Sequence, residues 1–296
     1  DVPANYKDDL PFAFRKGDRV AILGNGLADR MQHDGWLETL FQSELKGEHV
    51  NFRNMSLSGD RPNNYPRSKG FLGMDEYLRH VEADVVFAMF GYNESFAGQK
   101  GANPFKAQLI EFVKTIRAIQ PNGKTFPRIV LFSPIAFQDL KNRNLPRGKV
   151  HNRNLALYAE ATADAARQAG VQFVDLFNPT LALFKSTSDP LTINGAHLNE
   201  EGNRKVAQII AKALLNKEVK AGESLQSLRE AVLDKNWHWF NRYRATDGND
   251  IWGSRSKLRF VDDQSNAEVL QHELVMLDVM TANRDQHIWR LASGQK

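Results

Sequence analysis

Five short strand-like runs, most of them rich in apolar residues, are each followed by a segment with helical spacing, and this alternation limits most strongly how the chain can fold. The runs lie at residues 19–24, 49–54, 84–90, 128–133 and 171–176. The segments that follow them carry apolar residues at helical spacing and lie at residues 27–45, 74–83, 104–120, 151–169 and 200–215. Strands that are apolar throughout and are joined through helices form a parallel sheet covered on both faces. We therefore predict an α/β fold, a three-layer αβα sandwich with a five-stranded parallel sheet.

The alternation of strands and helices divides the chain into three parts. Residues 1–17 read as an irregular lead-in, and residues 18–216 contain all five strand–helix units. Residues 217–296 do not continue the pattern but show helical spacing at 223–235 and 267–290. We predict a mostly helical C-terminal extension that packs on the sheet domain.

An aromatic and basic cluster at residues 237–244 lies inside this extension and has two interpretations. Its rings can fill an interface between the extension and the sheet domain. Alternatively, they can stack on the apolar faces of a sugar, with arginine contacting acidic groups. In the second interpretation Trp239 and Arg242 are candidate substrate-binding residues.

Composition excludes several classes of site. The chain has no cysteine, which excludes disulfides, thiolate zinc sites and a cysteine nucleophile. Its eight histidines are dispersed without metal-ligand spacing, and no glycine-rich nucleotide loop is complete, so we expect no metal and no cofactor. A net charge of +4 on scattered basic residues argues against nucleic-acid binding. No apolar run is long enough to insert in a membrane.

Small and polar residues follow three of the predicted strands. Asn25 and Gly26 come after the first strand, Ser58 and Gly59 after the second, and Asn93 after the third. Ligands of open parallel sheets bind outside the carboxyl ends of the strands. We therefore expect these residues to meet in one cleft. A turn at Gly26 would expose backbone N–H groups at a helix N-terminus, which suits an anion.

A late loop adds His197, which lies just before the predicted helix at 200–215. Gly195 can shape the turn and Asn199 can cap the helix. The residue three positions before His197 is Asn194, which can hydrogen-bond to the ring but cannot stabilise an imidazolium by charge. We expect His197 in the same cleft, as a weak base or a proton donor.

Three acidic residues lie close to these motifs and are candidate partners of His197. Asp29 can point at the cleft or simply complement the positive end of a helix. Asp60 can be a second carboxylate of the site or a capping residue. Glu94 directly follows Asn93. Two carboxylates in one pocket would support glycoside hydrolysis, with their separation deciding the stereochemistry.

The strings GNGLADRMQ, FGYNESFAG and NGAHLNEEG, together with the Ser58–Asp60 motif, resemble the SGNH (GDSL-type) hydrolases over residues 18 to about 215. The resemblance implies that Gly59 and Asn93 occupy the oxyanion-hole positions. It also places His197 at the catalytic histidine. Gly26 stands where the family has its serine nucleophile, and Asn194 stands where it has the aspartate of an Asp-x-x-His pair.

The strings also resemble a subgroup of secreted bacterial proteins that is found with haem-binding dehydrogenase modules. This likeness implies a carbohydrate context, possible association with a dehydrogenase module, and a periplasmic or secreted location after removal of a signal peptide.

Two functions follow. The first is a serine-less hydrolase that acts on a carbohydrate ester or glycoside, a small molecule or an oligosaccharide, by attack of water assisted by His197 and a carboxylate. The second is a non-catalytic protein that keeps the pocket to bind a sugar or an anion.

Overall fold

A computed structural model of the protein describes residues 2–3, 6–67, 71–245 and 248–295. Its centre is a five-stranded sheet made of β1 (Arg19–Gly24), β2 (Asn51–Asn54), β3 (Val85–Met89), β4 (Arg128–Phe132) and β5 (Gln172–Val174). The strand order is β2-β1-β3-β4-β5, and every neighbouring pair is parallel. The predicted α/β sandwich is confirmed.

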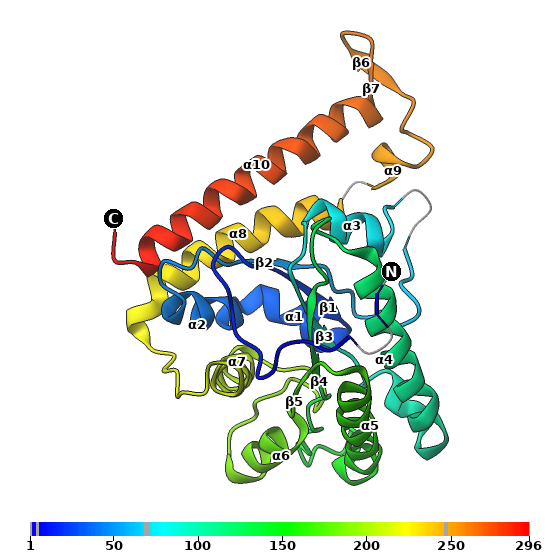
Figure 1. Cartoon of the computed structure of the whole chain (residues 1–296), viewed down its shortest axis with the longest axis vertical. Coiled ribbons are helices and arrows are strands. Elements are labelled where there is room, and N and C mark those ends of the chain that lie inside the picture. Colours follow the sequence, from blue (N-terminus) through cyan, green and yellow to red (C-terminus); the bar gives the residue numbers. More distant parts are fainter. Residues whose placement is uncertain (1, 4–5, 68–70, 246–247, 296) are drawn as a thin grey trace.

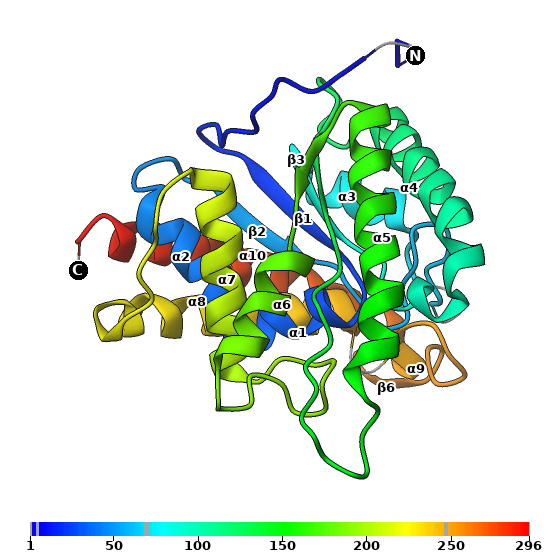
Figure 2. The same ribbon diagram turned by 90° about the horizontal axis from the view of Figure 1, so that it is seen from below.

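Helices cover both faces of the sheet, as Figures 1 and 2 show. The covering helices are α1 (Gly26–Asp34), α2 (Trp36–Glu44) and α7 (Glu200–Leu215) on one face, and α3 (Met74–His80), α4 (Gln99–Ile119) and α5 (Gly148–Ala169) on the other. Side chains of β1 alternate between the two layers, with Val20 and Ile22 in one core cluster and Ala21 and Leu23 in the other. The strand reads as continuously apolar because both of its faces are buried.

Two details of the helices differ from the sequence prediction. The segment at 27–45 is two helices, because Gly35 between them has φ +70°, a left-handed conformation that ends α1. A short helix α6 (Phe177–Ser186) follows β5 where no element was predicted. Short 3-10 turns η1 (Glu94–Ala97) and η2 (Glu223–Leu225) precede α4 and α8.

The C-terminal region consists mainly of α8 (Gln226–Arg244) and α10 (Asn266–Ala292), which pack along each other. A short helix α9 (Gly248–Ile251) and a hairpin of β6 (Arg259–Val261) and β7 (Gln264–Ser265) join them. Helix α8 also contacts α1, α2 and β2, so it closes the β2 edge of the sheet. The region is helical as predicted, whereas its division from the sheet domain at residue 216 remains a proposal.

Side chains of this region bond the outward carbonyl groups of the edge strand. The Trp289 indole donates to Val50 O at 2.8 Å, Lys235 Nζ donates to Phe52 O at 3.0 Å and the Trp239 indole donates to Asn54 O at 2.8 Å. An edge strand that is left open is a template for pairing with another chain. Here side chains of α8 and α10 use the carbonyl groups to which a sixth strand would otherwise bond.

The candidate substrate-binding roles of Trp239 and Arg242 need correction. Trp239 is only 2% exposed, stacks on Tyr243 and belongs to the core cluster beneath α8. Arg242 is also buried and pairs with Asp278 of α10 at 2.9 Å. The aromatic cluster therefore forms an interface, because α8 continues through residue 244 and turns these side chains toward the sheet and α10.

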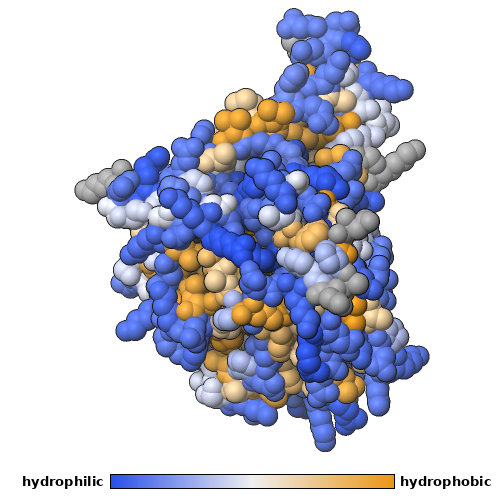
Figure 3. All heavy atoms as spheres, viewed as in Figure 1, coloured by the Kyte–Doolittle hydropathy of each residue, from blue (hydrophilic) through white to orange (hydrophobic). Residues whose placement is uncertain are grey.

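The outer side of α10 is partly apolar. Val275, Met276 and Val279 are each about half exposed, and Figure 3 shows apolar residues along this helix. No helix in the described ranges is long and apolar enough to cross a membrane.

Candidate functional site

A pocket of about 130 Å³ opens at the carboxyl ends of β1, β3 and β4. Its wall is made by Asn25, Gly26, Leu27, Ser58, Met89, Phe90, Tyr92, Asn93, Ser133, Pro134, Ile135, Ala196 and His197. The structure thus brings together residues from all four predicted motifs. A cavity of about 150 Å³ is known to hold benzene, so this one suits a small group such as a short acyl chain.

The turn between β1 and α1 depends on a close approach at Gly24. A Cβ on this residue would lie 2.4 Å from the Met89 carbonyl oxygen. Glycine has no Cβ, so the backbone can pass this close to Met89 and turn directly after β1. The Asn25 N–H then donates to the same Met89 oxygen at 3.2 Å. The turn puts Gly26 at the first position of α1, on the pocket wall.

Gly26 faces the ring of His197 across an open space. An ideal Cβ built on Gly26 would lie 3.5 Å from His197 Nε2 and 3.6 Å from Cδ2, with no other atom nearby. Its φ angle is outside the left-handed region, so the backbone would accept a side chain. A hydroxyl at this position would reach Nε2, but glycine supplies none.

Asn194 determines which ring nitrogen of His197 carries the proton. Its Oδ1 accepts the N–H groups of Ala196 at 3.1 Å and His197 at 2.9 Å, which uses both lone pairs. Its Nδ2 lies 2.9 Å from His197 Nδ1, and its Oδ1 lies 3.1 Å from the same nitrogen. Because Oδ1 already accepts two backbone N–H groups, Nδ2 is the better partner for Nδ1, and we assign the proton of the neutral ring to Nε2, toward the pocket. Burial, with a smaller effect from Arg30, lowers the pKa of His197, which favours the neutral ring.

Amide groups line the opposite side of the pocket. Asn93 Nδ2 donates to the Ser58 carbonyl at 2.9 Å, which holds the third motif against the second. Asn25 is buried, and its Nδ2 has no hydrogen-bond partner within the part of the chain that the structure describes. Gly59 follows Ser58 but is not part of the pocket wall. One N–H of the Asn93 amide is used by the Ser58 carbonyl, which leaves the second N–H for a ligand oxygen, whereas Asn25 Nδ2 has almost no accessible surface.

None of the three candidate carboxylates lines this pocket. Asp29 pairs with Arg244 at 2.6 Å, and Asp60 is fully buried in a two-point contact with Arg67 at 2.6 and 2.9 Å. Glu94 accepts the Gly91 N–H at 2.8 Å, and burial raises its pKa. Glu94 Oε1 is buried without a hydrogen-bond partner among the described residues, but none of the three carboxyl groups lies on the pocket wall, so the expectation that one assists His197 directly has no support in this geometry.

Sequence reasoning missed the wall that follows β4. Three residues directly after β4 line the pocket: Ser133, Pro134 and Ile135. In the sequence, their position after the fourth predicted strand was the one feature that could have indicated this role. The Ser133 hydroxyl accepts the backbone N–H groups of Leu176 and Phe177, so it fixes the start of α6. Within the described ranges no cluster of three or more His, Asp or Glu side chains could hold a metal ion.

A wider groove of about 710 Å³ lies on the other side of the loop that carries His197. Phe137 lines it and packs against Gly195, since a Cβ on Gly195 would lie 2.3 Å from the Phe137 ring. Gly195 has φ +88°, and Ala196 and His197 follow it into the small pocket. Lys141, Lys149 and Lys185 also border the groove. The groove has the size of a site for a larger polar group.

Comparisons with known proteins identify the family and the fold of the chain. The sequence model of the GDSL-like lipase/acylhydrolase family matches residues 22–205. An acetylxylan esterase of Xylanibacter ruminicola is 27% identical in an alignment of 238 positions that covers 71% of this chain and 46% of that protein. The chain thus spans about half the length of this curated relative.

Two solved structures share the fold. A GDSL-like lipase from Parabacteroides merdae superposes with a TM-score of 0.53 at 15% identity, over 69% of this chain and 99% of that one. A catalytic Ser-to-Ala mutant of an acetylxylan esterase from Geobacillus stearothermophilus gives 0.52 at 14% identity, over 71% and 100%.

Proposed function

This chain belongs to the GDSL-like lipase/acylhydrolase family, and we propose that it binds short O-acyl esters of carbohydrates and hydrolyses them slowly, without a serine ester intermediate. The observation that carries this proposal is the pocket of about 130 Å³ between Gly26 and His197, which has room for an acetyl-sized group and for water. The acetylxylan esterase among the relatives supports an acetylated carbohydrate as the first substrate to test.

In the proposed complex the acyl group enters the small pocket and the sugar lies toward the wide groove beside Phe137. The acyl carbonyl oxygen accepts hydrogen bonds from His197 Nε2–H and from the second N–H of Asn93 Nδ2, whose other hydrogen binds the Ser58 carbonyl. A neutral histidine can stabilise a developing oxyanion in this way.

Water in the space beside Gly26 adds to the acyl carbon, and the bond from that carbon to the sugar oxygen breaks. One proton of the water ends on the sugar hydroxyl. The other is released when the product acid ionises, so the products are a carboxylate and the free sugar. The reaction is slow because His197 presents a proton and not a lone pair to the water.

Release of acetate from acetylated xylo-oligosaccharides and from aryl acetates tests this proposal. We expect slow turnover in the wild type and a loss of about 100-fold in His197→Ala, the usual effect of removing an oxyanion donor. Turnover that His197→Ala leaves unchanged would contradict the assignment.

A serine-directed fluorophosphonate tests the absence of a covalent step. The wild type should stay unlabelled, since Gly26 has no hydroxyl. Stoichiometric labelling of Ser58 or Ser95, located by peptide mass spectrometry, would show that another serine serves as nucleophile.

A second function is favoured by one specific observation, the neutral Asn194 behind His197. In a serine protease, replacing the triad aspartate by asparagine lowers turnover about 10⁴-fold. With the serine missing as well, the pocket would only bind an acylated sugar or a carboxylate. Calorimetric binding that needs His197 and Asn93, with no acetate released over days, would select this function over hydrolysis.

A further inference from the structure

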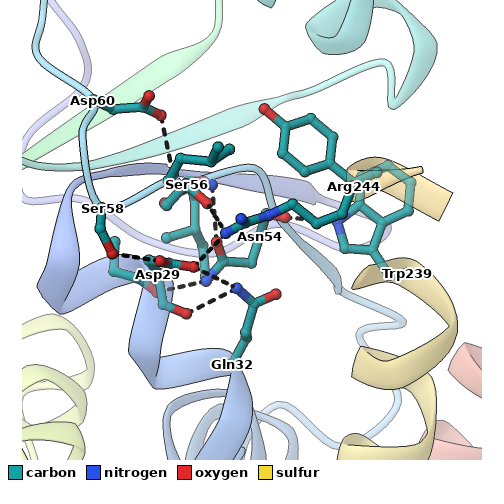
Figure 4. Close-up of polar contacts among 12 residues, drawn as sticks. Asp29, Gln32, Asn54, Ser56, Ser58, Asp60, Trp239 and Arg244 are labelled. Carbon is teal, nitrogen blue, oxygen red and sulfur yellow. Dashed lines mark hydrogen bonds and ion pairs between the residues drawn. The ribbon is translucent and has the colours of Figure 1, made fainter. Parts of the chain in front are cut away.

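The last turn of α8 reaches the pocket wall through a chain of polar contacts, drawn in Figure 4. Arg244, the final residue of α8, donates from Nη2 to Asp29 Oδ1 at 2.6 Å. The other oxygen of Asp29 accepts the Ser58 hydroxyl at 2.7 Å. Ser58 lines the pocket. Two side chains therefore connect the C-terminal extension to the site.

The same guanidinium also holds the backbone of this loop. Arg244 Nη2 donates to the Ser56 carbonyl at 3.1 Å, two residues before Ser58. Its side chain is 24% exposed and that of Asp29 is 13% exposed, so the pair is partly shielded from water. The guanidinium also lies over the Phe240 ring, 5.0 Å from its centroid, which restricts its position.

Two further residues of α8 contact the loop at residues 54–60. The Trp239 indole donates to Asn54 O at 2.8 Å, where β2 ends. The Tyr243 hydroxyl accepts from Arg67 Nη2 at 3.1 Å, and Arg67 holds Asp60. The loop that carries Ser58 is thus tied to α8 at its start, its middle and its end.

We propose that Arg244 is a positioning residue of the acyl-ester site, acting through Asp29 to fix Ser58 and the loop at residues 54–60. This inference rests on the proposed function. Arg244 lies outside the span that the family model matches, residues 22–205, so the position of the loop depends on a part of the chain beyond the family domain. Misplacement of a pocket wall by about 1 Å can cost 100-fold in turnover.

The test compares Arg244→Gln with Arg244→Lys, Asp29→Asn and the double variant Arg244→Gln/Asp29→Asn. We expect Arg244→Gln to raise KM for the acyl ester about 10-fold or more. Asp29→Asn should have a similar effect, and the double variant should be no worse than either, because both act through one contact. Lysine keeps one charged contact and should restore part of the loss.

Arg229→Gln is the matched control. Arg229 lies on the same helix and pairs with Glu200 at 2.9 Å, but it contacts Asp34 and not the loop. It should leave KM unchanged. Additive effects of Arg244→Gln and Asp29→Asn, or an equal effect of Arg229→Gln, would overturn the proposal.

Hydrogen exchange of the loop, read by mass spectrometry, separates this inference from the proposed function. Arg244→Gln should speed exchange of the amides of residues 54–60 while Arg229→Gln does not. If no acyl ester is bound or cleaved by the wild type, the proposed function fails whatever the exchange shows. If the wild type is active and neither KM nor loop exchange changes in Arg244→Gln, the positioning role alone is wrong.

Discussion

On one side of the pocket His197 faces the neutral amide of Asn194, whereas on the other side Asp29 is ion-paired with Arg244. Both sides use a residue that orients a pocket group, His197 in the first case and Ser58 in the second. Only on the second side is the orienting residue charged, as the carboxylate of Asp29 paired with Arg244. The difference indicates that electrostatic support here holds the shape of the pocket and does not activate a base.

The largest effect should come from restoring the missing groups on the His197 side. Gly26→Ser combined with Asn194→Asp should raise ester turnover at least about 100-fold, because the serine hydroxyl would meet Nε2 and the aspartate would free Nε2 to act as a base. Acetate release and fluorophosphonate labelling of the new serine measure the gain.

Gly26→Ala with Asn194→Asp is the matched control, since it adds the Cβ without the hydroxyl. The gain should also vanish when His197→Ala is added. If the serine variant is no faster than the alanine variant, the space beside Gly26 is not a nucleophile position.

The next effect, on stability and not on turnover, is expected from removing charge beneath the extension. Lys235 is buried and donates to Glu38 at 2.5 Å and to Phe52 O at 3.0 Å. Lys235→Met should lower the free energy of unfolding by about 3–5 kcal/mol, because it leaves the buried Glu38 without its partner. Urea unfolding followed by circular dichroism gives this value.

The double variant Lys235→Met/Glu38→Leu should regain most of that loss, since an apolar pair of similar size needs no counter-charge. A double variant as unstable as Lys235→Met would mean that packing of the lysine stem, and not the buried charge, dominates.

The smallest effect concerns the titration of His197. Burial and Arg30 lower its pKa in the folded protein, so the folded state binds fewer protons than the unfolded state just below pH 6.5. The stability that neutral His197 contributes is therefore complete above its unfolded pKa of about 6.5 and declines as the pH falls toward the folded value. NMR titration of the ring protons should show this lowered pKa.

Asn194→Asp should move the pKa of His197 upward, because a carboxylate favours the imidazolium. The control is Asp29→Asn, which removes a charge from the other side of the pocket and should change this pKa little. An equal pKa in wild type and Asn194→Asp would show that residue 194 does not face the ring in solution.

The sheet and the meeting of the motifs could be predicted because both follow from local pattern. The apolar runs predict buried parallel strands, and parallel strands end at one edge, so Gly26, Asn93 and His197 fall on one pocket. The break at Gly35 was missed, because the apolar spacing continues across it while only the backbone conformation changes.

The roles of the charged residues could not be predicted, because they depend on partners far away in the sequence. Asp29 looks the same in sequence whether it faces a cavity or Arg244, which is 215 residues further along. The ring of Trp239 could stack on a sugar if it were exposed. Only the path of α8 buries it against the sheet. The division into domains, the dehydrogenase partner and the periplasmic or secreted location stay predictions.

The bonds from Trp289, Lys235 and Trp239 to the carbonyl groups of β2 also bear on how the protein can be shortened. A fragment that ends where the family match ends, at residue 205, would cut through α7 and remove all three donors. One that ends at residue 216 would still expose the bare edge of the sheet. Such fragments should pair with one another through β2 and precipitate. The part of the chain that the family model matches is thus shorter than the part needed to cover the edge of the sheet.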